Sequence, residues 1–417
     1  MLKLLQSRNV VLQNGKYIKG VYLMIKFASR MDNLKGSAIR EILKIATMPG
    51  MISFAGGLPA PELFPVEEIT QAAVAVLKEN GTKALQYGET PGYEPLRVQI
   101  AERMLAKNNI RTDANHILIT SGSQQGLDFS GRVFLNPDDV VIIESPSYLG
   151  AINAFRQYQP KFVEVPTDEN GMIMEELDRI LATTENVKFI YIIPDFQNPS
   201  GRTWPLERRK QFMDIINKYE IPAIEDNPYG DLHFKGEYLP ALKSMDPKEL
   251  IMYFGTFSKI LSPGMRIGWI AASEQIIGKV NLIAQAAVLQ TATINAMAIS
   301  KYLEMFDIEA HVAKILPVYK HRCELMINTM RETFPEECRF TDPDGGLFTW
   351  CELPDYINTR DIAPVALERK VAFVPGDGFY PSGAVKNCMR LNYSNATDER
   401  LVEGVNRLAE VIKGAMK

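Results

Sequence analysis

The sequence has 417 residues, which is enough for two or three domains, and 46% of them are hydrophobic, as in a protein with an ample core. The 46 Lys and Arg against 50 Asp and Glu give a net charge of −4, so the chain lacks the basic excess that nucleic-acid binding requires. Four scattered cysteines and four scattered histidines, without CxxC or HExxH spacing, argue against a disulfide framework and a metal site. We therefore expect a protein of a reducing compartment, the cytoplasm, with no metal and no nucleic-acid partner.

In the amino-terminal 23 residues, polar and charged positions interrupt the apolar runs. This region lacks the continuous apolar segment and small-residue cleavage site of a signal peptide, and the patterned sequence begins only after Met24. We interpret residues 1–23 as a disordered extension or an artefact of the assigned start. Residues 280–300 are uncharged but contain Asn, Gln, Thr or Ser at seven positions, so we expect a packed segment and no membrane span.

Between about residues 95 and 275, short β-rich runs alternate with helix-like stretches. The runs lie at 117–120, 140–144, 161–165, 188–193, 221–225, 250–254 and 267–271. Amphipathic stretches lie between most of them, including 123–135, 173–181 and 206–219. Strands that alternate with helices at this spacing predict an α/β fold, with a mostly parallel sheet covered by helices on both faces.

The pattern changes after residue 300 to that of a smaller α+β domain. A long amphipathic stretch at 308–334 precedes short strands at 338–341 and 347–353, then helices near 360–369 and 397–415. We expect a large domain over residues 58–300. A small domain would combine residues 24–57 with 301–417.

Ligands of open α/β sheets bind at the carboxyl ends of the strands, so the residues that follow each predicted strand are candidates for ligand binding. SGSQQG (121–126) follows the first run and leads into a helix, whose free N–H groups and dipole suit an anion. By itself this segment reads as an ordinary helix start capped by Ser123. Tyr148, after the second run, suits either a stacking platform for a flat ring or the protein core.

Two Asn/Asp-Pro loops follow the next strands and could be ordinary turns. Asn198 lies in the first loop, and Asp226 and Tyr229 lie in the second. Asp226 comes directly after a strand that we expect to be central, where a carboxylate needs a partner such as a protonated ring nitrogen.

Lys259 follows the run at 250–254 and is flanked by apolar residues, although most lysines are solvated surface charges. A desolvated lysine has a lowered pKa and can act as a Schiff-base nucleophile. Thr256, Ser258 and Arg266 would then supply hydroxyls and a fork for a phosphate. Together with the preceding loops, these groups match the needs of pyridoxal 5′-phosphate (PLP), which has an aldehyde, a protonated pyridine nitrogen and a phosphate.

The motifs extend this pattern along most of the chain. They are SFAGGLPAPELFP (53–65), ALQYGETPGYEPLR (84–97), TSGSQQGLD (120–128), FQNPSGRT (196–203), EDNPYGDL (225–232), GTFSKILSPGMRIGW (255–269) and NCMRLNYS (387–394). Over about residues 34–415 the sequence resembles the fold-type I PLP-dependent aminotransferases of class I/II. It is similar in particular to the kynurenine/2-aminoadipate aminotransferase branch.

The resemblance implies a role for each matching residue around the cofactor. Lys259 would form the imine with the PLP aldehyde and move the proton between Cα and C4′, while Asp226 would pair with the pyridinium nitrogen. Tyr229 and Asn198 would hydrogen-bond the phenolic oxygen of the ring, and Tyr148 would stack on its face. The phosphate would be bound by Ser123, Gln124, Thr256, Ser258 and Arg266, joined by Tyr87 of the neighbouring subunit of a homodimer.

On the substrate side, the resemblance implies that Arg390 clamps the α-carboxylate, helped by Asn198 and Gly57. Arg40 either borders the pocket for the substrate side chain or lies on a solvated helix face. The implied reaction is a ping-pong transfer of an amino group, within amino-acid metabolism or biosynthesis. The donor would be an aromatic, 2-aminoadipate-like or aliphatic L-amino acid, and the acceptor a 2-oxo acid such as 2-oxoglutarate.

Two other functions use the same residues. A PLP-dependent β-lyase or decarboxylase would keep the cofactor site but need no amino acceptor. A ligand-sensing regulator would fuse the same fold to a DNA-binding helix-turn-helix, for which only about 30 unpatterned residues are available. A nicotinamide dehydrogenase is disfavoured because the chain has no glycine-rich dinucleotide fingerprint.

Overall fold

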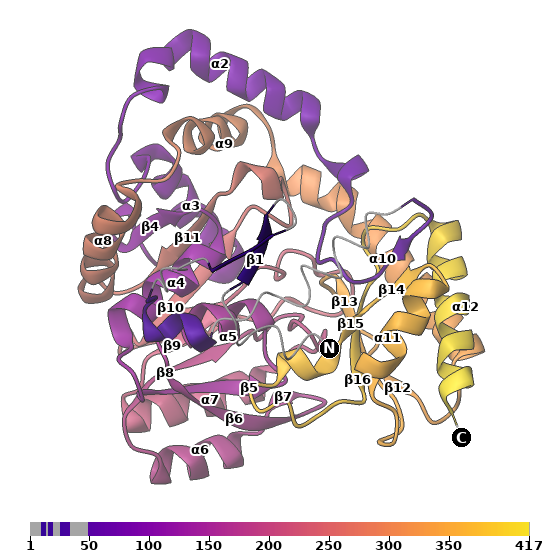
Figure 1. Ribbon diagram of the computed structural model, residues 1–417. Helices are drawn as coiled ribbons and strands as arrows, with labels where there is room; N and C mark the ends of the chain where they lie inside the picture. Colours follow the sequence, from indigo (N-terminus) through magenta and orange to yellow (C-terminus); the bar gives the residue numbers. More distant parts are fainter. Residues whose placement is uncertain (1–9, 14–15, 20–25, 34–48, 417) are drawn as a thin grey trace. The chain divides into compact units, whose positions relative to one another are not determined.

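The computed structural model describes residues 10–13, 16–19, 26–33 and 49–416 (Figure 1). The chain divides into two units, residues 1–35 and 36–417. In the first unit, β1 (Val10–Gln13) and β2 (Lys16–Lys19) pair antiparallel, and a 3-10 turn, η2, spans Ser29–Asn33. The second unit contains every other element and the candidate site.

The centre of the second unit is an eight-stranded sheet with the strand order β4-β11-β10-β9-β8-β5-β6-β7. Its strands are β4 (Ile117–Thr120), β5 (Val140–Ser145), β6 (Lys161–Asp168), β7 (Gly171–Met172), β8 (Val187–Ile192), β9 (Ala223–Asp226), β10 (Ile251–Thr256) and β11 (Gly268–Ala271). The pairings from β6 through β5, β8 and β9 to β10 are all parallel. Only β11 and the short β7 run antiparallel to their neighbours. The predicted mostly parallel sheet is confirmed.

Helices cover both faces of this sheet because alternate strand residues point to opposite sides. Val141, Ile143 and Tyr191 pack with α4 (Ser123–Phe134), α5 (Leu149–Arg156) and α8 (Glu274–Val288) on one face. Ile142, Ile190 and Ile192 pack with α6 (Met174–Thr183) and α7 (Leu206–Tyr219) on the other. Nearly continuous apolar strands are typical of a sheet buried on both sides.

Four further helices pack beside the β4 end of the sheet. They are α2 (Val66–Ala84), α3 (Glu94–Asn108), α9 (Thr293–Met305) and α10 (Ile308–Thr333), and α2 lies along α9 (Figure 1). The uncharged stretch 280–300 is divided between α8 and α9. No helix in the described part of the chain is long and apolar enough to cross a membrane.

A second, antiparallel sheet has the order β12-β13-β16-β15. It consists of β12 (Arg339–Phe340), β13 (Phe348–Glu352), β15 (Val374–Pro375) and β16 (Cys388–Asn392). It packs with α10, α11 (Thr359–Glu368) and α12 (Asp398–Ala415), as predicted for the region after residue 300. The amino-terminal β3 (Ile52–Ser53) pairs with β14 (Val371–Ala372). Phe54 is buried in the hydrophobic cluster that α10, α11 and α12 form with this second sheet.

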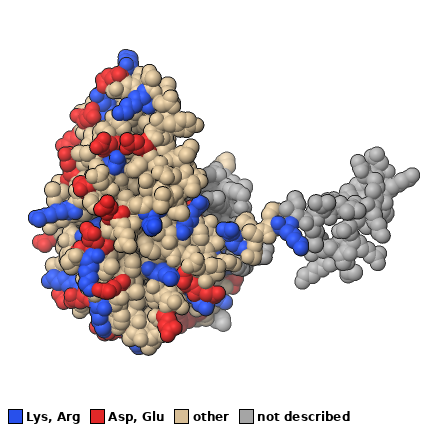
Figure 2. Space-filling model, turned by 90° about the vertical axis from the view of Figure 1, so that its left-hand side faces the viewer, with Lys and Arg blue, Asp and Glu red and all other residues tan. Residues whose placement is uncertain are grey.

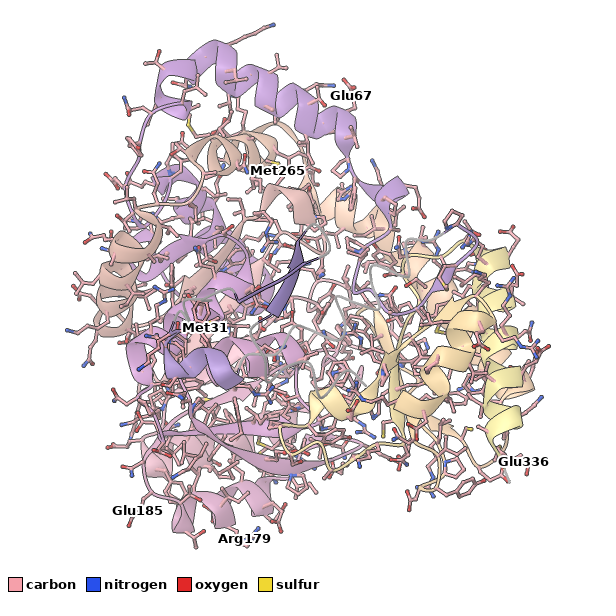
Figure 3. All side chains as sticks on the ribbon, in the orientation of Figure 1. Met31, Glu67, Arg179, Glu185, Met265 and Glu336 are labelled. Atoms are coloured by element: carbon pink, nitrogen blue, oxygen red, sulfur yellow. The ribbon has the colours of Figure 1, made fainter. Side chains whose placement is uncertain are left out.

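Short 3-10 turns complete the described elements: η3 (Pro61–Leu63), η4 (Ala114–His116), η5 (Leu242–Met245), η6 (Pro263–Met265) and η7 (Gly376–Phe379). Glu67, Arg179 and Glu336 are exposed and point outward (Figure 3). On the face shown in Figure 2, acidic and basic side chains are interspersed, and neither sign dominates a region.

Candidate active site

The order and direction of the strands bring the predicted site residues to one edge of the sheet. Strand β4 runs parallel to β10, because both pair antiparallel with β11. The same antiparallel strand brings Arg266, just before its start, to the edge where β9 and β10 end. Ten predicted residues line one cavity of about 150 Å³ there: Ser123, Gln124, Tyr148, Asn198, Asp226, Tyr229, Thr256, Ser258, Lys259 and Arg266.

Asp226 is the last residue of β9, an inner strand of the sheet, and its side chain is buried. Its Oδ2 accepts a hydrogen bond from the hydroxyl of Tyr191 at 2.8 Å, while Oδ1 is buried without a partner among the described residues. Burial raises the pKa of the Asp226 carboxyl to about 7, and the hydrogen bond from Tyr191 acts in the opposite direction. A buried, unpaired carboxylate oxygen on a cavity wall suits a protonated ring nitrogen.

Lys259 lies just beyond β10, and its Nζ donates to the carbonyl of Gly57 at 2.8 Å. Burial, together with the positive charges of Arg390 and Arg266, lowers the pKa of the amine to about 8. No carboxylate forms an ion pair with this lysine within the described ranges. A substantial fraction of the amine is therefore neutral, and hence nucleophilic, near physiological pH.

The segment before α4 forms a cradle for an anion. Gly122 has a φ of 75°, and a Cβ there would overlap the guanidinium of Arg266. Arg266 donates from Nη2 to the carbonyl of Ser121 at 2.8 Å and forms no ion pair with any described residue. Thr256 and Ser258 line the same cavity, and the hydroxyl of Thr256 donates a hydrogen bond to that of Ser258 at 2.8 Å. Helix α4 begins at Ser123, so the N-cap is Gly122 rather than Ser123.

Arg390 lies on β16 of the second, antiparallel sheet, and its side chain is buried. It donates from Nη1 to Oδ1 of Asn198 and from Nη2 to the carbonyl of Ala55, both at 2.8 Å. Its guanidinium lies 4.3 Å from the ring centroid of Phe348 and 5.2 Å from that of Phe379. Its Nε is buried without a partner among the described residues. Burial lowers its pKa to about 10, so the charge remains, and it has no counter-ion within the described ranges of the chain.

Asn198 connects this arginine to the ring-binding side of the cavity. Its Nδ2 donates to the hydroxyl of Tyr229 at 3.2 Å, and its Oδ1 accepts from Arg390. Tyr148 borders the start of α5, and burial raises the pKa of its phenol, so the ring is neutral. Gln124 donates to the carbonyl of Gly150 at 3.0 Å.

One predicted residue stands apart from the cavity. Tyr87 is 79% exposed and lines a different hollow, with Lys83 and Tyr93. Arg40 lies outside the described residues.

The sequence interpretation missed two buried polar residues that support the site. Tyr191 on β8 holds Asp226. Glu144 at the end of β5 accepts hydrogen bonds from the backbone N–H of Ile193 at 3.1 Å and from Nε2 of Gln197 at 3.3 Å. Burial raises the pKa of Glu144 to about 7. The sequence did contain a signal for Glu144, because a glutamate at the end of an apolar strand is unusual. Tyr191 gave no such signal, because an aromatic residue within an apolar strand is ordinary in a core.

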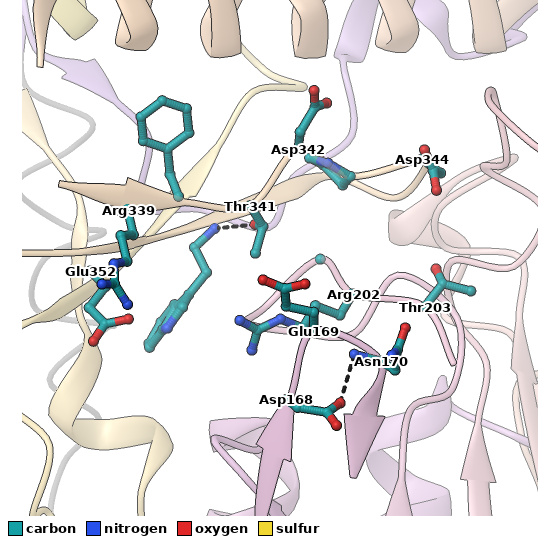
Figure 4. Close-up of a pocket in the computed structure, with 14 residues that line it drawn as sticks. Asp168, Glu169, Asn170, Arg202, Thr203, Arg339, Thr341, Asp342, Asp344 and Glu352 are labelled. Atoms are coloured by element: carbon teal, nitrogen blue, oxygen red, sulfur yellow. Dashed lines mark hydrogen bonds between the residues drawn. The ribbon is translucent and has the colours of Figure 1, made fainter. Parts of the chain in front are cut away.

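A cavity larger than that of the candidate site lies elsewhere, and size alone would have favoured it. It has a volume of about 880 Å³ and lies between the β6–β7 hairpin, residues 201–203 and the β12–β13 region (Figure 4). Asp168, Glu169 and Arg202 line one side of it, and Arg339, Asp342 and Glu352 line the other (Figure 4). It contains no lysine and no aromatic stacking partner beside a buried carboxylate.

Comparison with known proteins identifies the family. Residues 51–408 match the family described as Aminotransferase class I and II. The chain belongs to this family. It is 43% identical to an aromatic-amino-acid aminotransferase of Thermococcus litoralis, over 94% of this chain and 95% of that protein. It is 39% identical to a 2-aminoadipate transaminase of Thermus thermophilus, over 94% and 97% of the two chains.

Solved structures agree with this assignment. A kynurenine aminotransferase of Pyrococcus horikoshii, in complex with pyridoxamine 5′-phosphate (PMP), is 39% identical and superimposes with a TM-score of 0.91 over 94% of this chain and 98% of that one. The protein is a PLP-dependent aminotransferase of fold type I, so the resemblance inferred from the motifs is confirmed.

Three observations on this chain fit PLP. The unpaired Oδ1 of Asp226 suits the pyridine nitrogen, the cradle beside Gly122 and Arg266 suits the phosphate, and the buried amine of Lys259 suits the aldehyde.

Proposed function

We propose that this aminotransferase moves the amino group of an aromatic, 2-aminoadipate-like or aliphatic L-amino acid to 2-oxoglutarate in two half-reactions of ping-pong type. The observation that carries the proposal is that Lys259, Asp226 and Asn198 line one cavity. One carboxylate oxygen of Asp226 has no partner among the described residues, and Asn198 is hydrogen-bonded to Arg390. The names of relatives at 43% and 39% identity, an aromatic-amino-acid aminotransferase and a 2-aminoadipate transaminase, support this range of donors.

In this proposal, the residues of the cavity divide the cofactor between them. Asp226 pairs with the pyridine nitrogen, Tyr229 and Asn198 donate to the phenolic oxygen, and Tyr148 stacks on the ring. The phosphate is bound by Ser123, Gln124, Thr256, Ser258 and Arg266, and by Tyr87 of a second copy. When bound, PLP supplies an electron sink that stabilises negative charge at the substrate Cα.

Lys259 then serves as the base and acid of the reaction. It would hold the cofactor covalently in the resting enzyme and, once freed, its amine would take up the proton from the substrate Cα and later release it. Its pKa of about 8 suits both directions of transfer, because the amine is then neither a very weak base nor permanently protonated. Phe257 and Ile260 are buried on either side of it and exclude water.

Arg390 would bind the substrate α-carboxylate. A buried guanidinium without a counter-ion binds a planar carboxylate through two parallel hydrogen bonds, and its contacts with Asn198 and Ala55 fix its plane. Phosphate at one end and carboxylate at the other would orient the Cα–H bond relative to the ring.

We also propose a homodimer, because Tyr87 is too exposed to serve the cavity of its own chain. Leu85 is 75% exposed and Leu289 is 59% exposed, and apolar side chains exposed to this degree are typical of an interface. The large domain would span 58–300 and the small domain 24–57 with 301–417; the pairing of β3 with β14 supports this division. Four buried, free cysteines support a reducing, cytoplasmic compartment.

The test is a panel of L-amino acid donors assayed with and without 2-oxoglutarate. We expect the formation of 2-oxo acid from an aromatic or 2-aminoadipate donor to depend on the acceptor and to stop in the Lys259→Ala variant. Turnover that continues without an acceptor would instead indicate a lyase or decarboxylase and would overturn the proposal.

A further inference from the structure

The two oxygens of the Asp226 carboxylate have different environments. Oδ2 accepts a hydrogen bond from Tyr191 at 2.8 Å, and Oδ1 is buried with no partner in the part of the chain that the structure describes. The residue lines the cavity that contains Lys259. One oxygen is therefore bound by the protein, and the other is available to a ligand.

The sheet fixes the place of the tyrosine. Tyr191 on β8 pairs in register with Ile224 on β9, so Asp226 lies two residues further along the neighbouring strand and on the same face. The ring is fully buried, and Phe155 of α5 contacts it edge-on with the ring centroids 5.8 Å apart. The phenol therefore has little freedom to move away from the carboxylate.

We propose that Tyr191 is a positioning residue for the cofactor: by holding Oδ2 of Asp226 it directs Oδ1 to the pyridine nitrogen of PLP and favours the ionised form of the carboxylate. This inference rests on the proposed pairing of Asp226 with that nitrogen. The tyrosine itself touches neither the substrate nor the reacting atoms in this proposal.

The ionisation of Asp226 is the property that Tyr191 controls. Burial raises the pKa of this carboxyl to about 7, so near neutral pH the buried carboxyl is only partly ionised. A hydrogen bond donated to the carboxylate stabilises the ionised form. Burial and the nearby carboxylate hold the pKa of the Tyr191 phenol well above its usual value, so it remains a donor throughout this range.

Other titratable groups face the same carboxylate. Tyr148 before α5 and Tyr229 in the loop after β9 interact with Asp226 electrostatically, and Lys259 after β10 and Arg266 before β11 line the same cavity. All four are unchanged in a Tyr191→Phe variant. A difference between the pH profiles of variant and wild type therefore reports the lost hydroxyl.

The test measures the Kd of the apoenzyme for PMP, which carries no aldehyde for Lys259, as a function of pH. A hydrogen bond to a charged group changes the ionisation equilibrium of Asp226 by a factor of about ten. We expect Tyr191→Phe to bind PMP about eightfold more weakly than wild type at roughly pH 6.5 and about equally at roughly pH 9. Its melting temperature should stay within a few degrees of the wild-type value, because the ring still fills the core.

Tyr253→Phe is the matched control, since Tyr253 is a buried tyrosine on the adjacent strand β10 that packs in a different cluster. We expect it to leave the PMP profile unchanged at every pH. A Tyr191→Phe ratio that is constant with pH, or that equals the ratio for Tyr253→Phe, would overturn the inference. Failure of the wild type to bind PMP at any pH would instead overturn the proposed function, so the two failures are distinguishable.

Discussion

Replacement of Arg390 by lysine tests whether its two-pronged geometry, and not only its charge, binds the substrate. Arg390 donates to Asn198 and Ala55 and keeps a buried Nε without a partner. Lysine retains a positive charge but cannot make two parallel hydrogen bonds to a carboxylate.

The expected loss follows from the contacts that disappear. One charge-assisted hydrogen bond to the substrate is worth about 1.5–3 kcal/mol. Its loss corresponds to a decrease of roughly 10- to 100-fold in kcat/KM for amino donors. The Kd for PLP should change by less than about twofold, because Arg390 belongs neither to the phosphate cradle nor to the pairing of Asp226 with the ring nitrogen.

The assay is steady-state kinetics with three donors of different side chain, together with a PLP titration of the apoenzyme. Arg322→Lys provides the control, because Arg322 is a buried arginine that donates to the carbonyl of Ser394 at 2.7 Å and does not line the cavity. A decrease in kcat/KM of less than about threefold for Arg390→Lys, or an equal decrease for both variants, would refute the assigned role.

Three further predictions concern the lysine, the anion cradle and the core. The rate at which the apoenzyme binds PLP covalently, measured by stopped-flow absorbance, should rise with pH through about 8. The reason is that the neutral amine of Lys259 is the nucleophile and its pKa is lowered to about 8. A rise centred near the pKa of a free lysine would contradict the burial of this amine. Gly122→Ala should weaken PLP binding by about tenfold or more while the affinity for pyridoxal without phosphate stays the same, since the added Cβ displaces Arg266; equal weakening of both ligands would place the phosphate elsewhere. Gly404→Ala on α12 should lower the free energy of unfolding by about 1–3 kcal/mol in urea titrations without changing KM, because the methyl group overlaps Phe54 and Ile52; Gly414→Ala, which meets open space, is its control.

Much of the fold was predictable because local pattern and tertiary environment agree. Apolar runs gave each strand of the large sheet except the short β7, and the helix predicted at 206–219 is α7 at Leu206–Tyr219. The antiparallel direction of β11 was not predictable from its sequence. Its apolar residues suit either direction, and only pairing with β4 and β10 on both sides determines it.

The site could be predicted where chemistry departs from what a core requires. Asp226 after a buried strand and Lys259 between apolar residues are conspicuous because burial of a charge is costly. Tyr191 and Glu144 were missed because a tyrosine or glutamate within a strand run has several ordinary explanations. Only the strand register, which places Tyr191 diagonally from Asp226 on one face, shows its role.

The central claim is that Lys259 holds PLP covalently in a cavity built from the ends of five strands and the start of β11. Reduction of the PLP-loaded protein with borohydride, followed by peptide mass spectrometry, tests it most directly. We expect a phosphopyridoxyl group on the peptide that contains Lys259 and none in the Lys259→Ala variant. A label on a different lysine, or no label at all on the wild-type protein, would contradict it.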